Sequence, residues 1–196
     1  EELKDKMKKL YLPQPDEKTG IIPQFDGYFD LKEIDLSVYK NASVVGTVFH
    51  DYSGEDVQGM QAGKQADIVE LLYQMEDITT PDNKAKNYVY YEARTLHDSS
   101  LSKAIHSITA CDLGMEKEAY DMFMSAALTD LGQEMKSSDA GIHSANMGGV
   151  WQDVVMGFGG IRIRDGHLRI APNCPKQWEK FTYPLYWKGN ELDRKS

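Results

Sequence analysis

Five successive segments of this 196-residue chain are predicted helices, four of them from apolar residues at helical positions, and this constrains the fold more than any other feature. The first, from Lys64 to Met75, is apolar around most of its circumference, so we expect a largely buried helix. The second begins at Pro81, a residue suited to a first helical turn, and reaches Tyr91. The other three stripes are Leu101, Ile105, Ile108 and Cys111; Ala119, Met122, Phe123 and Ala126; and Val150, Val154, Val155 and Phe158. The pattern predicts helices packed in antiparallel-type pairs.

The periodicity changes from helical to alternating after residue 160. Ile161–Arg164 alternates apolar and charged residues, Asp165-Gly166 is a strong signal for a two-residue turn, and His167–Ile170 alternates back. Such a turn sets Ile163 opposite Leu168 and Ile161 opposite Ile170. The four apolar side chains of the hairpin then lie on one face, so its register is self-consistent.

The remaining segments give weaker signals. Residues 2–12 have the composition of a charged helix, which Pro13 stops. Residues 20–29 form an extended, aromatic-rich loop, and residues 44–52 are patterned too weakly to predict anything but a loop. Residues 181–187 alternate as a further strand, ended by Gly189-Asn190. A short β-region should therefore follow the helices.

The composition limits the partners and compartments that we expect. A formal net charge of −9 repels nucleic acid and anionic lipid, so we expect neither as a partner. The apolar runs are too short to span a membrane, and residues 1–6 lack the apolar stretch of a signal peptide. Cys111 and Cys174 lie far apart without metal-ligand spacing, which predicts free thiols in a reducing compartment, the cytoplasm.

Two segments have the composition of helix starts that bind an anion. His97-Asp98-Ser99-Ser100 directly precedes a predicted helix, and two hydroxyls beside the free N–H groups of a helix start make an anion site. The alternative is that a serine or the aspartate only caps the helix. A second start lies at residues 141–149, where His143 or Ser144 precedes a helix and Gly148 allows close approach. If the two starts converge, they form a local positive pocket on an acidic protein.

Glu92 is a candidate sugar-binding carboxylate because it follows the aromatic run Tyr88, Tyr90 and Tyr91. The alternative is a surface glutamate paired with Arg94. Lys64-Gln65 opens a predicted buried helix, where polar side chains either cap the helix or point into a cleft. The motifs and spacings of metal ligands are absent from the sequence, so we expect no metal site. We assign no role to His50, His106 or His167.

These segments, in this order, resemble glycoside hydrolase family 65, which includes maltose, trehalose, kojibiose and nigerose phosphorylases. The resemblance covers nearly the whole chain, and KQAD and HDSSLS are specific when they occur together. One departure is Ala93, where the family more usually has proline, a change of minor consequence. The matching segments are 22–29 (IPQFDGYF), 64–69 (KQADIV), 90–102 (YYEARTLHDSSLS), 143–151 (HSANMGGVW) and 157–162 (GFGGIR).

The resemblance implies a fold and a set of site residues. The fold is mainly α: residues 1–158 would form the second half of an (α/α)6 barrel, and residues 159–196 would start a small C-terminal antiparallel β-domain. The residues that would hold the glucosyl unit are Lys64, Gln65 and Glu92. The residues that would bind phosphate are Ser99, Ser100 and His143, with Gly148 nearby.

The reaction implied by the resemblance is inverting phosphorolysis of an α-glucoside. Phosphate attacks the anomeric carbon while a carboxylic acid protonates the leaving oxygen, giving β-glucose 1-phosphate and an acceptor sugar. Inorganic phosphate is a co-substrate, and no cofactor is expected. The family's general acid lies in an upstream Gly-Pro-Asp-Glu-Tyr-like segment that does not occur here, so we expect no catalytic residue in this chain.

We therefore expect a C-terminal fragment that is inactive alone. Its partners would be a disaccharide, phosphate and the missing N-terminal part of the same enzyme. Half a barrel would expose a large apolar face, so association, including a homodimer, is expected.

Two other functions stay open from the sequence. A family 65 α-glucoside hydrolase would use Glu92 as the base that activates water. The serine pair and His143 favour phosphate, because a hydrolase has less reason to keep an anion pocket. A non-catalytic module would bind sugar or phosphate without turnover.

Overall fold

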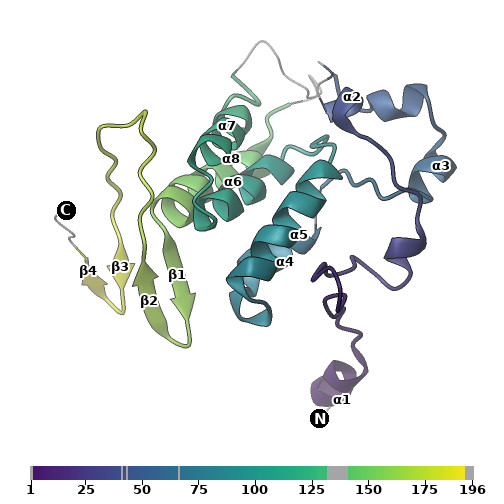
Figure 1. Cartoon of the computed structure of the whole chain (residues 1–196). Coiled ribbons are helices and arrows are strands. Elements are labelled where there is room, and N and C mark those ends of the chain that lie inside the picture. Colours follow the sequence, from purple (N-terminus) through teal and green to yellow (C-terminus); the bar gives the residue numbers. More distant parts are fainter. Residues whose placement is uncertain (1, 41, 43, 66, 132–140, 193–196) are drawn as a thin grey trace.

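Helices dominate the computed structural model, which describes residues 2–40, 42, 44–65, 67–131 and 141–192 (Figure 1). The α-helices are α1 (Glu2–Lys9), α2 (Ser37–Lys40), α3 (Gly54–Gln58), α4 (Asp67–Gln74), α5 (Pro81–Ala93), α6 (Ser102–Asp112), α7 (Glu116–Ala127) and α8 (Ser144–Gln152). Three short 3₁₀ turns and one π-helix are η1 (Tyr28–Asp30), η2 (Thr47–His50), η3 (Glu76–Ile78) and the π-helical η4 (Asp153–Phe158). The strands are β1 (Ile161–Arg164), β2 (His167–Ile170), β3 (Tyr186–Trp187) and β4 (Asn190–Glu191). The predicted fold class, mainly α with a small antiparallel β-region at the end, is confirmed.

Helices α4 to α8 form the body of the molecule and alternate between two layers (Figure 1). Helix α6 packs against both α4 and α8, while α5 lies against α4 and α7 lies against α6. Local signals set the helix ends: the Thr80 hydroxyl accepts from the Asn83 N–H at 3.2 Å, and Pro81 opens α5. Gly114 takes a left-handed φ of 70° after α6, as a helix-ending glycine does.

The core lies between these layers and is closed by the segment that precedes α4. Tyr88, Ile108 and Phe158 are almost fully buried within it. The Asn87 side chain accepts from the Ile22 N–H at 2.8 Å, and the Tyr91 hydroxyl donates to the Ile22 carbonyl. Because both side chains come from α5, they hold the backbone at Ile22 against that helix.

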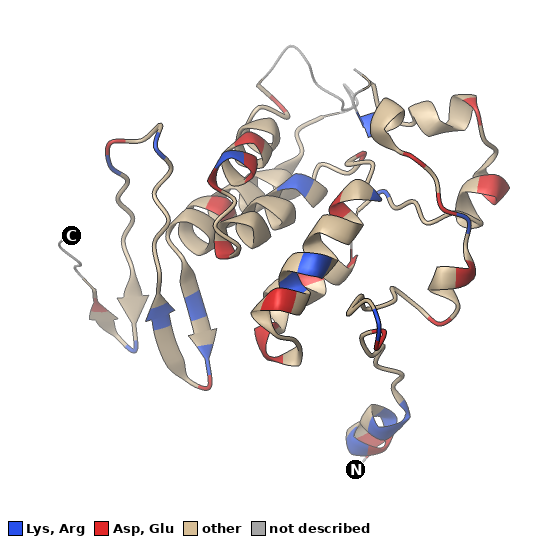
Figure 2. Cartoon of the chain, viewed as in Figure 1, with Lys and Arg blue, Asp and Glu red and all other residues tan. Residues whose placement is uncertain are grey.

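The predicted hairpin forms with the predicted register. Strand β1 pairs antiparallel with β2, with Ile161 opposite Ile170 and Ile163 opposite Leu168. Of these four side chains only Ile161 is buried, and Ile163 is exposed. The hairpin is anchored instead by Arg162, whose side chain reaches carboxylates of the helical body. Figure 2 shows the basic residues of β1 and β2 beside the helices.

The structure corrects several predicted boundaries. Helix α1 ends at Lys9 rather than residue 12, and η2 occupies part of the segment predicted as loop at 44–52. Lys64 and Gln65 precede α4 instead of opening it, while Ala66 lies outside the described residues.

The two C-terminal corrections concern backbone pairing. The helix predicted to run to Phe158 changes to π-helical hydrogen bonding at Asp153. The strand predicted at 181–187 is only Tyr186–Trp187, because Pro184 has no N–H for a ladder and the preceding residues find no partner strand among those described.

Within the described ranges, no helix is both long enough and apolar enough to cross a bilayer.

Candidate active site

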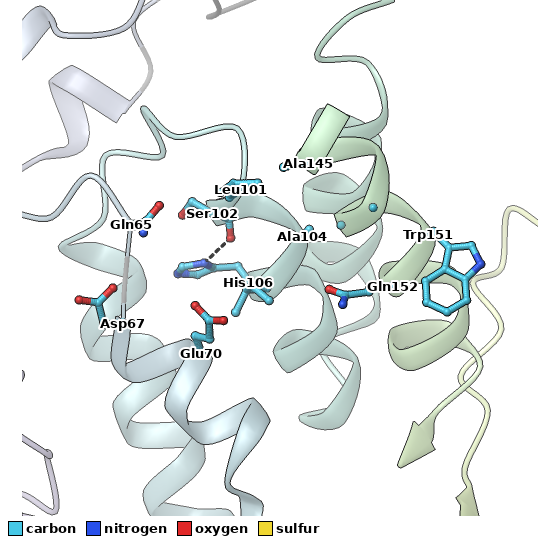
Figure 3. Close-up of a pocket in the computed structure, with 13 residues that line it drawn as sticks. Gln65, Asp67, Glu70, Leu101, Ser102, Ala104, His106, Ala145, Trp151 and Gln152 are labelled. Atoms are coloured by element: carbon cyan, nitrogen blue, oxygen red, sulfur yellow. Dashed lines mark hydrogen bonds between the residues drawn. The ribbon is translucent and has the colours of Figure 1, made fainter. Parts of the chain in front are cut away.

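A pocket of about 370 Å³ lies where α4, α6 and α8 meet (Figure 3). Residues at the starts of all three helices line it, so the starts of α6 and α8 meet at this pocket and the start of α4 joins them. His106 extends from α6 toward the side that carries Gln65 and Asp67, while Trp151 and Gln152 lie at the opposite end. The lining residues are Gln65, Asp67, Glu70, Leu101, Ser102, Ala104, Ile105, His106, Ala145, Gly148, Gly149, Trp151 and Gln152.

The predicted site residues divide between this pocket and its surroundings. Gln65 and Gly148 line it and are exposed. Lys64 is an exposed neighbour of Gln65 in the chain, and His143 stands directly before α8. The remaining three lie outside the pocket lining: Glu92 is in the last turn of α5, and Ser99 and Ser100 are on the connection from α5 to α6. Their roles in binding stay predictions.

The start of α6 lacks the side-chain cap that the sequence suggested. The residue at the cap position is Leu101, and the Ser99 hydroxyl accepts only from the Leu101 N–H, at 3.3 Å. The Asp98 carboxylate instead accepts from the Gly46 N–H at 3.0 Å. The N–H of Ser102, the first residue of α6, donates to the Ser99 carbonyl at 3.2 Å, so the backbone itself takes one donor of this helix start.

His143 is held at the start of α8 by Asp130, which the sequence analysis did not single out. One carboxylate oxygen accepts from the His143 backbone N–H at 2.9 Å, and the other lies 2.7 Å from Nδ1 of the ring. A carboxylate only accepts, so Nδ1 carries the proton and Nε2 is the nitrogen left for a ligand. The hydrogen bond from His143 also lowers the pKa of Asp130.

Glu92 is not a surface glutamate paired with Arg94. Its carboxylate forms an ion pair with Lys40, whose ammonium also donates to the Glu92 carbonyl at 2.5 Å. Arg94 pairs with Glu33 instead. Burial would raise the pKa of Glu92, but hydrogen bonds from His97 and Lys40 and the Lys40 charge lower it to about 2. Glu92 is therefore ionised at neutral pH and can accept hydrogen bonds but cannot deliver a proton.

A buried polar cluster next to Glu92 was missed by sequence reasoning. His97 lies with Nδ1 2.9 Å from the Ser102 hydroxyl and Nε2 3.5 Å from the Glu92 carboxylate. Nδ1 of His106 donates to the Ser102 carbonyl at 2.9 Å, and the two imidazole rings meet edge to face. Burial lowers the pKa of both histidines, that of His106 to about 3. The sequence signal that could have predicted this contact is that His97 precedes Ser102 by five residues, on the other side of a helix start.

Among the residues that the structure describes, no group of three or more His, Cys, Asp or Glu side chains could hold a metal ion.

Comparison with known families finds two matches along the chain. The central catalytic domain of glycosyl hydrolase family 65 matches residues 1–152, and the C-terminal domain of the same family matches residues 161–193. The boundary predicted between Phe158 and Gly159 falls between the two matches and stays a prediction.

Similar proteins with curated functions include kojibiose, trehalose and nigerose phosphorylases. The chain is 46% identical over 189 residues, 96% of its length, to kojibiose phosphorylase of Halothermothrix orenii. It is 40% identical over 95% of its length to kojibiose phosphorylase of Escherichia coli, and 36% identical over 95% to α,α-trehalose phosphorylase of Thermoanaerobacter brockii. It spans about a quarter (24%) of the length of each of these relatives.

A solved structure shows the same arrangement of elements. It is provisionally described as a kojibiose phosphorylase from the human microbiome, and it superposes with a TM-score of 0.84 at 30% sequence identity. The match covers 97% of this chain and 28% of that protein.

Proposed function

The chain belongs to glycosyl hydrolase family 65, and from this premise we propose that it is the C-terminal part of an inverting disaccharide phosphorylase. The reaction is phosphorolysis of an α-glucoside to β-glucose 1-phosphate and an acceptor sugar. The observation that carries the proposal is the pocket at which the starts of α4, α6 and α8 meet, with Gln65 and Gly148 in its lining. The starts of α6 and α8 supply partial positive charge, whereas the start of α4 brings the acidic side chains Asp67 and Glu70 into the same lining.

The glucosyl unit is assigned to Lys64, Gln65 and Glu92. An ionised carboxylate accepts hydrogen bonds from sugar hydroxyls, and the lowered pKa of Glu92 suits this role. The same pKa excludes Glu92 as the acid that protonates the leaving oxygen. The acid is assigned to a part of the parent enzyme outside this sequence.

Phosphate is assigned to the region of Ser99, Ser100 and His143, with Gly148 nearby. No side chain caps the start of α6 among the described residues, and the positive end of the helix dipole there favours an oxyanion. Asp130 orients His143 and leaves Nε2 for the anion. Phosphate is its own nucleophile, so no cofactor is required.

The names of the relatives favour phosphorolysis over hydrolysis, because all three reported above are phosphorylases. The proposed partners are therefore a disaccharide, phosphate and the upstream part of the same enzyme, with a homodimer as the proposed assembly. Cys111 and Cys174 are both free thiols, which supports a reducing compartment such as the cytoplasm.

The full-length enzyme that carries this chain tests the proposal. Incubated with phosphate and kojibiose or trehalose, it should release glucose 1-phosphate whose anomeric proton in NMR is that of the β form. Ser100→Ala and His143→Ala should each raise the KM for phosphate about tenfold, the loss of one charge-assisted hydrogen bond. Lys117→Ala, an exposed side chain at 90%, is the control. Free glucose formed without phosphate would instead identify a hydrolase.

A further inference from the structure

We propose that His97 is a positioning residue that fixes Glu92 relative to the first turn of α6, and so holds the sugar subsite in register with the anion subsite. The inference rests on the proposed function, because it takes the roles of Glu92 and of the α6 start from there. His97 itself touches neither ligand in this proposal and acts through its two neighbours.

The geometry joins three elements through one imidazole. Glu92 belongs to the last turn of α5, and its Oε2 pairs with Lys40 while its Oε1 lies 3.5 Å from Nε2 of His97. On the other side of the ring, Nδ1 lies 2.9 Å from the hydroxyl of Ser102, the first residue of α6. Each carboxylate oxygen thus has its own cationic or hydrogen-bearing neighbour.

The proton positions follow from the partners. A carboxylate only accepts, so the nitrogen that faces Glu92 must carry the hydrogen. Burial lowers the pKa of His97, so the ring is neutral and its other nitrogen, Nδ1, accepts from the Ser102 hydroxyl. The Ser102 hydroxyl therefore donates to His97 at 2.9 Å, and the N–H on the other side of the ring faces the Glu92 carboxylate at 3.5 Å. Nε2 of His97 is buried and makes no hydrogen bond within the described residues, and the Glu92 carboxylate, 3.5 Å away, is the acceptor that it faces.

His97 is also held more tightly than a connecting residue requires. It is only 7% exposed, and its backbone takes a φ of 55°, a left-handed conformation that a non-glycine residue adopts at a cost. The edge-to-face contact with His106 has ring centroids 4.6 Å apart. Nδ1 of His106 donates in turn to the carbonyl of Ser102. The ring therefore cannot rotate without breaking contacts to α6.

This arrangement matters for a one-step displacement between two bound substrates. The attacking phosphate and the anomeric carbon must be held at reacting distance, and an error of about 1 Å is costly. Ser99 and Ser100 lie between Glu92 and Ser102 in the sequence. Because His97 contacts both Glu92 and Ser102, it sets the distance between the sugar subsite and the phosphate subsite.

Two conservative replacements separate the two contacts. In the full-length enzyme, His97→Gln places an amide N–H where Nε2 lies, and His97→Asn places an amide oxygen where Nδ1 lies. We expect His97→Ala to raise the KM for disaccharide and the KM for phosphate about tenfold each. His97→Gln should restore mainly the disaccharide KM, and His97→Asn mainly the phosphate KM. His167→Ala, an exposed histidine of β2, is the matched control.

The outcomes decide between positioning and mere packing. If the KM changes simply follow the loss of melting temperature, with no selective rescue, the proposal is overturned. If His97→Ala does not fold, the Gln and Asn variants alone decide by the same criterion. Calorimetric binding of glucose and of inorganic phosphate separates this test from the reaction. Selective rescue of binding in an enzyme without turnover would contradict the proposed reaction but support the role of His97.

Discussion

At the scale of single residues, burial assigns different charge states to ionisable groups around the pocket. Glu92 stays ionised because Lys40 and His97 compensate its burial, while the buried rings of His97 and His106 stay neutral. Asp153 is the opposite case, since it has no exposed surface and neither carboxylate oxygen has a hydrogen-bond partner among the described residues. Burial raises the pKa of Asp153 to about 9, so it is protonated at neutral pH.

Asp153 should therefore make stability fall as pH rises. Below pH about 4 both the folded and unfolded states hold the proton, whereas up to pH about 9 only the folded state does. Each unit of pH in that window removes about 1.4 kcal/mol of stability. In the full-length enzyme, Asp153→Asn should gain melting temperature over the wild type progressively from pH 5 to pH 8.

The control for this slope is Asp121→Asn, because Asp121 is an exposed partner of Lys117. Its melting curve should keep the pH dependence of the wild type. A constant difference between Asp153→Asn and the wild type across the pH range would show that Asp153 is ionised in the folded state.

Sequence reasoning found residues whose signal is local and missed those defined by packing. Gln65 and Gly148 were chosen from their places at helix starts, and both line the pocket. His106 stands beside an apolar stripe and looked unremarkable, yet its ring lines the pocket and contacts His97. Asp130 was missed because its partner, His143, is 13 residues away in sequence, so only the fold brings them together.

At the scale of elements, the hairpin depends on one buried arginine. Arg162 contacts Glu76 at 2.9 Å and both oxygens of Asp112 at 2.7 and 2.8 Å, and it lies over the Tyr73 ring. Its side chain is 3% exposed. The two carboxylates stand at the end of α6 and in η3, so this guanidinium ties β1 to the helical body.

Replacing Arg162 should release the hairpin. Arg162→Met leaves buried carboxylates with one cation fewer, which should cost about 3 kcal/mol or more. Arg169→Met removes a contact to the same Glu76, but that side chain is 57% exposed, so about 1 kcal/mol or less is expected. Thermal unfolding of the full-length enzyme and hydrogen exchange at residues 161–170 measure both. Equal losses in the two variants would contradict the anchoring role.

Elements with strong periodicity could be predicted, and those set by distant partners could not. Pro81, the apolar stripe from Leu101 to Cys111 and the Asp165-Gly166 turn predicted α5, α6 and the hairpin register, which the structure confirms. The stretch 181–187 has the alternation of a strand, but its first aromatic ring, Phe181, packs on Trp178 and stacks with Tyr183 instead. An alternating apolar and polar pattern indicates which side chains are buried, but it does not show that a neighbouring strand is present to pair with.

At the scale of the whole molecule, the helical body is incomplete on its pocket side. Met147 and Trp151 lie one turn apart on α8 and are 53% and 58% exposed. Leu101, at the start of α6, is 44% exposed beside the same pocket. Apolar side chains gathered around a pocket usually mark a surface that another segment covers. Since the chain spans about 24% of its relatives' length, the upstream part of the same enzyme is the proposed cover.

The purified chain should therefore not catalyse phosphorolysis. A general acid typically contributes 10²- to 10⁴-fold to such a step, so turnover should fall about 1,000-fold below that of the full-length enzyme. A coupled assay for glucose 1-phosphate measures it, with the full-length enzyme as the positive control. Glu92 is ionised, and Asp153 holds a proton but has no exposed surface. Since neither carboxyl can protonate a leaving sugar, turnover by this chain would refute the assignment of the acid to the upstream part.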